Sequence, residues 1–189
     1  MRYADPNGDD RLLMVTISGP PGSGTSTLVA RLSDSFGWKY MNGGQVFREE
    51  ASRRSISVEE LSSIAKENLE IDRSLDELLQ RRMTSNDCPE IVESRLSGWW
   101  AYQNKIECVR VWIEVSKDER ARRIQKREGG SFQDCLERSK NRQENDMERY
   151  NQLYGINLDD LSPYTLIVHA DEKDEKEVFK LVSDELRSQ

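Results

Sequence analysis

Residues 12–36 read LLMVTISGPPGSGTSTLVARLSDSF, and this stretch decides the fold. The apolar, β-branched run over residues 12–18 predicts a buried strand, and residues 26–36 have the character of a helix. Between them lies a glycine-rich loop that can turn sharply and point its backbone N–H groups into one concavity. A strand, a glycine loop and a helix in this order predict a phosphate-binding site at the start of the helix.

The loop departs at one position from the common phosphate-binding pattern G-x-x-x-x-G-K-[ST]. Gly19, Gly24 and Ser26 match the pattern, whereas Thr25 stands at the lysine position. A lysine would place a charge on the outer phosphates, and losing one such contact costs about 3 kcal/mol in the transition state. A plain glycine turn before a helix is the alternative interpretation. The residues expected to hold the nucleotide phosphates are Gly19, Pro20, Pro21, Gly22, Ser23, Gly24, Thr25, Ser26 and Thr27.

Strands alternate with helices along the rest of the chain. Predicted strands cover residues 38–41, 89–94, 108–115 and 164–169, and predicted helices cover residues 45–54, 57–68, 70–83, 117–128, 132–154 and 175–186, with a turn at Gly43 and Gly44. This alternation predicts an α/β fold in which helices cover both faces of a five-stranded parallel sheet. A helical insert over residues 43–85 is expected at one end of the sheet.

Polar residues end three of the predicted strands. In a parallel sheet, ligands bind beyond the carboxyl ends of the strands, where Ser18, Asn42 and Glu93 should gather. The Ser26 hydroxyl is placed to bind a Mg²⁺ ion that bridges the nucleotide phosphates, and Glu93 could hold that ion through water. A helix cap or an ion-paired carboxylate is the alternative for Glu93.

Arginines could supply the charge that Thr25 lacks. The chain has 19 arginines against 9 lysines, and arginine binds phosphate in a bidentate manner. Arg48 and Arg95 lie close behind predicted strands and could reach a second phosphate. The long predicted helix carries Arg138, Arg142 and Arg149 on one stripe about 40° wide. A solvent-exposed helix face is the alternative for this stripe.

Composition excludes several classes of protein. The net charge of −7 argues against nucleic acid and anionic membranes as partners. No apolar run is long enough to span a membrane, and residues 1–10 are expected to be a disordered tail ahead of one domain over residues 11–189. Cys88, Cys108 and Cys135 predict neither a disulfide framework nor a zinc site. We therefore expect a cytoplasmic monomer.

Three conspicuous side chains are expected to be structural. Trp99 and Trp100 follow Gly98 and are more often packing residues than platforms for a base. His169 ends a predicted strand without neighbouring ligand residues, so no metal or catalytic role is assigned to it.

Six separated segments resemble the nucleoside monophosphate kinases, most closely the archaeal type of cytidylate kinase. They are GPPGSGTST (19–27), NGGQVFRE (42–49), LEIDRSLD (69–76), ESRLSGW (93–99), RRIQKREG (122–129) and RYNQLYGINLDDLSPY (149–164). The match runs in order from residue 14 to the end, and the family tolerates threonine at the lysine position. The resemblance implies a P-loop kinase fold and transfer of the ATP γ-phosphoryl group to CMP or dCMP with Mg²⁺.

The resemblance also implies a role for each matched residue. On the acceptor side, it places Arg48 and Arg95 on the monophosphate, with Gly44 and Asp72 in the same site. On the donor side, Arg123 and Arg127 would lie at the base of a lid formed by residues 127–150, and Arg142 and Arg149 would close on the transferring group. The residues with an implied catalytic role are Arg95, Arg127, Arg142 and Arg149.

The chain departs from the family pattern near the acceptor. Gln45 stands where the family has Glu or Asp, Ser94 replaces a glycine, and VHAD (168–171) replaces the usual end of the last strand. Two alternatives therefore stay open beside the (d)CMP kinase. One is a nucleotide-binding module without turnover, and the other is a kinase for another monophosphate or a small metabolite.

Overall fold

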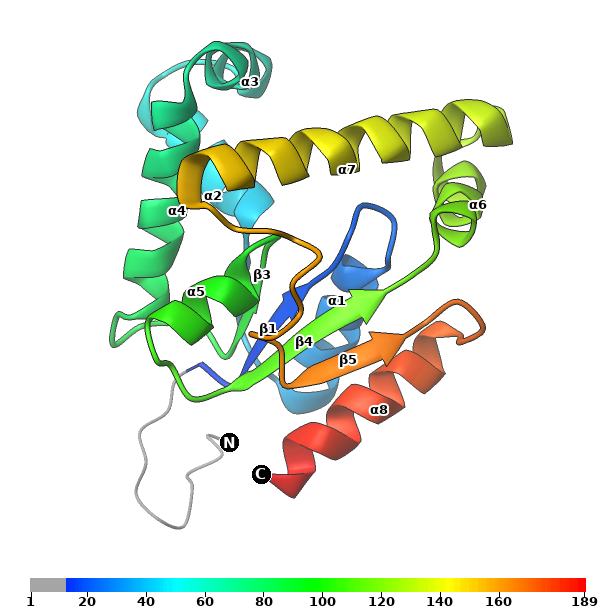
Figure 1. The fold of residues 1–189 in the computed structure, drawn as a ribbon. Helices are drawn as coiled ribbons and strands as arrows, with labels where there is room; N and C mark the ends of the chain where they lie inside the picture. Colours follow the sequence, from blue (N-terminus) through cyan, green and yellow to red (C-terminus); the bar gives the residue numbers. More distant parts are fainter. Residues whose placement is uncertain (1–12) are drawn as a thin grey trace.

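A five-stranded, all-parallel sheet forms the centre of the protein (Figure 1). The structure is a computed structural model that describes residues 13–189, so the expected tail over residues 1–10 lies outside the described residues. The strands are β1 (Val15–Ser18), β2 (Tyr40–Asn42), β3 (Ile91–Glu93), β4 (Val109–Glu114) and β5 (Leu166–His169), in the order β2-β3-β1-β4-β5. The α/β fold with five parallel strands is therefore confirmed.

Helices connect the strands and cover the sheet. They are α1 (Thr25–Phe36), α2 (Gly43–Arg53), α3 (Val58–Glu67), α4 (Leu69–Met83), α5 (Ser97–Gln103), α6 (Lys117–Glu128), α7 (Phe132–Tyr154) and α8 (Glu175–Ser188). Successive strand residues point to opposite faces, so Ile91 joins a core with α1 and α8, while Val92 joins a second core with α4 and α5. The phosphate loop lies between β1 and α1, as the sequence predicts.

The predicted turn at Gly43 and Gly44 is wrong, because both residues open α2. Asn42 is the N-cap, and its side-chain Oδ1 accepts a hydrogen bond from the Gln45 backbone N–H at 2.8 Å. The Gln45 side-chain Oε1 in turn accepts from the Asn42 N–H at 2.9 Å. An amide oxygen thus serves this capping box as well as a carboxylate oxygen would, so Gln45 preserves the local structure.

Helix α5 was not predicted from the sequence. It has only seven residues and begins with Ser97 and Gly98. A Cβ at Gly98 would overlap the ring of Tyr164, so glycine is required for this close packing. Trp100 is buried and meets Tyr154 edge-on with ring centroids 4.9 Å apart, which confirms a packing role.

Helix α7 runs from α6 to the side of α2 and α4, above the carboxyl ends of the strands (Figure 1). Gly129 and Gly130 join it to α6 with φ angles of 77° and 88°, a conformation that favours glycine. Of the helices formed by residues 13–189, none combines the length and the apolar character that a membrane span needs. The course of α7 brings one helical face over the phosphate loop.

Candidate active site

A cavity of about 480 Å³ opens where β1 and β3 end. The phosphate loop and the start of α1 form one wall, the segment after β3 forms the floor, and α2, α4 and α7 complete the lining. This position agrees with the ligand-binding edge predicted for a parallel sheet. The predicted site residues that line it are Gly19, Pro20, Pro21, Gly22, Gly24, Thr25, Ser26, Thr27, Gly44, Asp72, Glu93, Arg95, Arg127, Arg142 and Arg149.

The loop presents free backbone donors to this cavity. Gly22 and Gly24 have φ angles of 84° and 94°, so the chain can turn tightly there. Gly24 caps α1 without a side-chain hydrogen bond, and no acidic residue occupies the first turn of this helix. The side chains of Ser116 and Ser131, in contrast, cap α6 and α7. The N-terminus of α1 is therefore open to an anion.

The Thr25 hydroxyl is bound by a carboxylate that lines the same cavity. Its Oγ1 donates to Glu93 Oε1 at 2.7 Å. Burial raises the pKa of the Glu93 carboxyl, and the hydrogen bond from Thr25 opposes that increase. Among the described side chains, no cluster of three or more His, Cys, Asp or Glu residues could hold a metal ion without help. A cation at this loop would therefore depend on the Ser26 hydroxyl, on water and on ligand phosphates.

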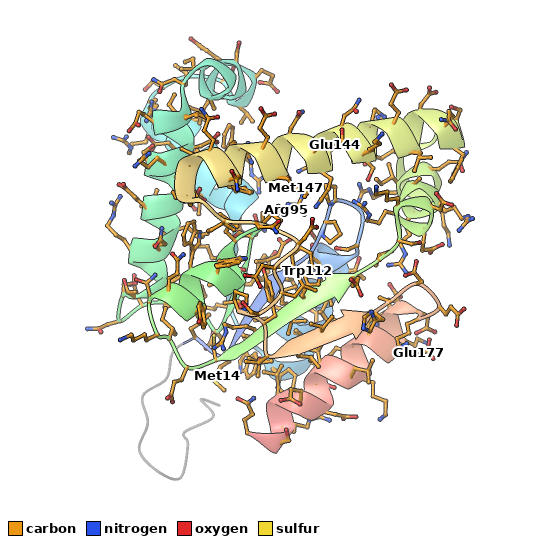
Figure 2. All side chains as sticks on the ribbon, in the orientation of Figure 1. Met14, Arg95, Trp112, Glu144, Met147 and Glu177 are labelled. Carbon is orange, nitrogen blue, oxygen red and sulfur yellow. The ribbon has the colours of Figure 1, made fainter. Side chains whose placement is uncertain are left out.

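Arginines from two separate elements meet at a pair of carboxylates. Arg95 lies between α7 and the ends of the strands (Figure 2), and its Nη2 is 2.9 Å from Asp146 Oδ2. Arg149 Nη2 donates to Asp146 Oδ1 at 2.9 Å. Arg149 Nε lies 3.6 Å from Asp72 Oδ2, which is too long for a hydrogen bond but close enough for an ion pair. Asp146 therefore joins the segment after β3 to α7.

Arg95 also contacts the phosphate loop, because its Nη1 donates to the carbonyl oxygen of Gly19. This contact and the Asp146 pair use three of the five guanidinium N–H groups. The remaining N–H groups are available to a ligand in the cavity.

Two of the three arginines on the α7 stripe face the cavity. Arg142 and Arg149 line the cavity, and Arg149 also lies over the Tyr150 ring, 4.7 Å from its centroid. Arg138 is outside the cavity and is exposed, with Nη1 3.9 Å from Glu128 Oε2. Of the three, Arg138 is therefore the one that the cavity does not include.

Three predicted residues are not part of the cavity lining. Ser23 is buried within the loop, and Arg123 Nη1 donates to its carbonyl oxygen at 3.1 Å. Arg123 therefore supports the loop from outside the cavity. Arg48 is exposed on α2 and forms no hydrogen bond or salt bridge with the residues that the structure describes. Its Nη1 lies near Gly44, where an added Cβ would be 3.3 Å away.

Sequence reasoning found Asp72 and Glu93 but missed two other acidic residues of the site, Asp76 and Asp146. Asp76 lines the cavity beside Asp72 and accepts a hydrogen bond from the Tyr154 hydroxyl at 2.9 Å. Burial is the main reason why the pKa of Asp76 rises to about 6. A signal was present, because Asp72 and Asp76 are four residues apart on α4 and so share one helical face. Asp146 similarly falls between Arg142 and Arg149.

The raised pKa of Asp76 predicts a specific pH dependence of stability. From about pH 4 to pH 6, the folded protein keeps the Asp76 proton that the unfolded chain has lost, so the free energy of unfolding falls as pH rises. Asp76→Asn removes this titration and keeps an oxygen for Tyr154. Between these two pH values, we expect the free energy of unfolding of the variant to rise by about 3 kcal/mol relative to that of the wild type. Urea unfolding of both proteins at several pH values measures the difference, and a constant difference would contradict the prediction.

Comparisons with known proteins agree with this geometry. A family model described as an AAA domain matches residues 18–140, from the end of β1 into α7. A cytidylate kinase of Archaeoglobus fulgidus is 36% identical over 170 residues, which cover 90% of this chain and 92% of that protein. This chain belongs to the cytidylate kinase family. A cytidylate kinase of Sulfurisphaera tokodaii is also 36% identical, over 90% of this chain and 93% of its own length.

Membership of the cytidylate kinase family confirms the resemblance seen in the six segments and identifies the chain as a P-loop enzyme. A solved structure of shikimate kinase from Acinetobacter baumannii in complex with shikimate has a TM-score of 0.63 at 10% identity. The match covers 95% of both chains. At this identity the likeness shows the shared kinase fold alone.

Proposed function

We propose that this protein transfers the γ-phosphoryl group of ATP to CMP or dCMP, giving ADP and CDP or dCDP. One observation carries the proposal beyond family membership: a single cavity joins the open phosphate loop to four arginines. These are Arg95, Arg127, Arg142 and Arg149, and they come from three separate parts of the chain. Phosphoryl transfer needs this arrangement, because positive charge must surround a group that moves between two anions.

ATP is proposed to bind with its phosphates on the loop. The backbone N–H groups from Gly22 to Ser26 and the N-terminus of α1 supply the donors. Arg123 would hold the loop from behind and contribute to the nucleotide site. The Ser26 hydroxyl and, through water, the Glu93 carboxylate are hard oxygen donors that suit Mg²⁺. Mg²⁺ held by these residues would supply positive charge that neutralises part of the charge of the phosphates.

CMP is proposed to bind on the side of α2 and α4. Arg95 and Arg48 would hold its phosphate near Gly44, and Asp72 would belong to the same site. Asp76 lies at the cavity wall formed by α4 and is a candidate for contact with the acceptor nucleoside. This arrangement places an acceptor phosphate oxygen opposite the loop, where the donor phosphates would lie.

The reaction needs no covalent intermediate on the protein. An oxygen of the acceptor phosphate forms a bond to the γ-phosphorus, and the bond to the bridging oxygen of ADP breaks. Arg142 and Arg149 would neutralise the charge that spreads over the transferring group. Residues 127–150 would act as a lid that excludes water, with the insert at residues 43–85 as the acceptor-binding part of a single domain.

Turnover with a panel of acceptors tests the proposal. Purified protein is incubated with ATP, Mg²⁺ and CMP, dCMP, UMP, AMP or a small hydroxylated metabolite, and nucleoside diphosphates are quantified. Formation of CDP or dCDP is the expected result. Transfer to UMP, AMP or a metabolite alone would assign a kinase with another acceptor.

A nucleotide-binding module without turnover is the second candidate. The Thr25 hydroxyl favours it, because this group is engaged by Glu93 rather than free for the phosphates. Calorimetry would then show ATP binding while no acceptor yields ADP.

We also propose a cytoplasmic monomer. Cys88 and Cys135 are buried free thiols, as suits a reducing compartment. Sedimentation equilibrium of the full chain tests the monomer.

A further inference from the structure

Arg120 is a buried cation that lies behind the phosphate loop. It belongs to α6, is not part of the cavity lining, and is only 4% exposed. Its Nη1 is 3.4 Å from both the Pro21 carbonyl oxygen and Ser139 Oγ, and its Nε has no hydrogen-bond partner. Both contacts are long and involve neutral groups. The full charge of the guanidinium is therefore poorly compensated.

Two other arginines contact the same loop, and carboxylates compensate their charges. Arg95, Arg120 and Arg123 donate to the alternate loop carbonyls of Gly19, Pro21 and Ser23. Arg95 is paired with Asp146, and Arg123 is paired with Glu119. Arg120 has no carboxylate within salt-bridge distance among the side chains that the structure describes. Burial and the charge of Arg95 both lower its pKa, but arginine stays protonated in proteins.

Helix α6 holds this charge close to the loop. A Cβ at Gly22 would lie 3.0 Å from the Ile124 side chain and 3.2 Å from the Arg120 carbonyl oxygen, so helix and loop are in direct contact. Pro21, which accepts the Arg120 hydrogen bond, lines the cavity on its other side. An anion seated on the loop would therefore be separated from Arg120 by little more than one layer of backbone.

We propose that Arg120 supplies, from behind the loop, the positive potential that a lysine at position 25 would supply from within the cavity. A charge in a poorly solvated position acts over a longer distance than a surface charge, because water screens it less. The anion that completes the charge balance is the polyphosphate of a nucleotide. Arg120 acts through the loop and touches no substrate, so it is a positioning residue. The inference rests on the proposed function only in requiring nucleotide phosphates on the loop.

Two substitutions separate charge from mechanical support. Arg120→Met removes the charge and keeps much of the volume, whereas Arg120→Gln also removes the charge but keeps a donor for Pro21 and Ser139. We expect both variants to weaken ATP binding about 10- to 50-fold in calorimetry with Mg²⁺. The thermal unfolding midpoint of the methionine variant should be unchanged or higher, because a poorly paired buried charge is lost. Arg122→Met, on the exposed face of the same helix, is the matched control and should bind ATP as the wild type does.

The decisive measurement is whether a lysine in the loop restores the ATP affinity that the Arg120 variant has lost. Thr25→Lys should improve ATP affinity at least about tenfold in the Arg120→Met background and by less than about threefold in the wild type. Wild-type affinity in Arg120→Gln, or no restoration by Thr25→Lys, would show that Arg120 only supports the loop and would overturn the proposal. ATP affinity requires no turnover. A wild type that binds ATP but phosphorylates no acceptor would therefore refute the proposed kinase and leave this inference standing.

Discussion

Replacing Arg95 with alanine is expected to lower kcat/KM for CMP by about three orders of magnitude and to change the Kd of ATP by less than about threefold. The guanidinium lies at the floor of the cavity, between the Gly19 carbonyl and Asp146, with N–H groups left for a ligand. Only an acceptor phosphate reaches this position in the proposed arrangement. Initial rates at varied CMP and ATP calorimetry measure the two quantities.

The stability of the Arg95 variant must be measured with its activity. Both side chains of the Arg95–Asp146 pair are only 12% exposed, so removal of Arg95 leaves a buried carboxylate with Arg149 as its remaining partner. We expect the free energy of unfolding to fall by about 3 kcal/mol. Arg95→Ala combined with Asp146→Asn should recover most of this stability and none of the activity toward CMP. Equal losses of ATP and CMP binding would instead place Arg95 on the donor side.

The strand, loop and helix at the start of the chain could be predicted because their signals are local. The β-branched run, the glycines and the helical residues all lie within residues 12–36. The start of α2 was misjudged for a related reason, because two adjacent glycines are typical of a turn. The deciding contacts there are those between Asn42 and Gln45, which satisfy the first backbone groups of a helix.

Features that depend on distant parts of the chain could not be predicted in the same way. Helix α5 is short and is stabilised by packing of Gly98 against Tyr164, 66 positions later in the sequence. The pairing of Arg95 with Asp146 likewise joins residues far apart in the chain. Arg120 lies among several arginines of one helix, and nothing in the spacing of these residues distinguishes the buried one. The charge behind the loop becomes visible only when α6 is placed against Gly22.

The stripe on α7 shows why helical periodicity alone does not identify function. An arginine face opposite an apolar face is the pattern of any exposed helix. The same pattern forms a cavity wall once the phosphate loop and α4 lie opposite Arg142 and Arg149. The resemblance to a kinase family supplied this distinction, since it matched Arg149 within a specific segment.

Replacing Arg142 with alanine is expected to lower kcat about 100-fold and to change the Kd of either substrate by less than about threefold. Arg142 is exposed, lines the cavity, and forms no hydrogen bond or salt bridge with the side chains that the structure describes. Its charge attracts the Glu128 carboxylate only weakly through solvent, and it gains its strongest partner when charge spreads over the transferring phosphoryl group. Rates at saturating ATP and CMP measure this effect.

Arg138→Ala is the matched control for Arg142, because Arg138 lies one turn earlier on the same stripe and outside the cavity. We expect this variant to keep the wild-type kcat. Arg142 and its electrostatic partner Glu128 are both exposed, so replacement of Arg142 should change the free energy of unfolding little. A fall in kcat cannot then be a consequence of a weakened fold. An unchanged kcat would show that Arg142 is a solvated surface residue without a role in phosphoryl transfer. A fall in kcat for Arg142→Ala alone would show that the α7 stripe contains one functional and one solvated arginine at neighbouring turns.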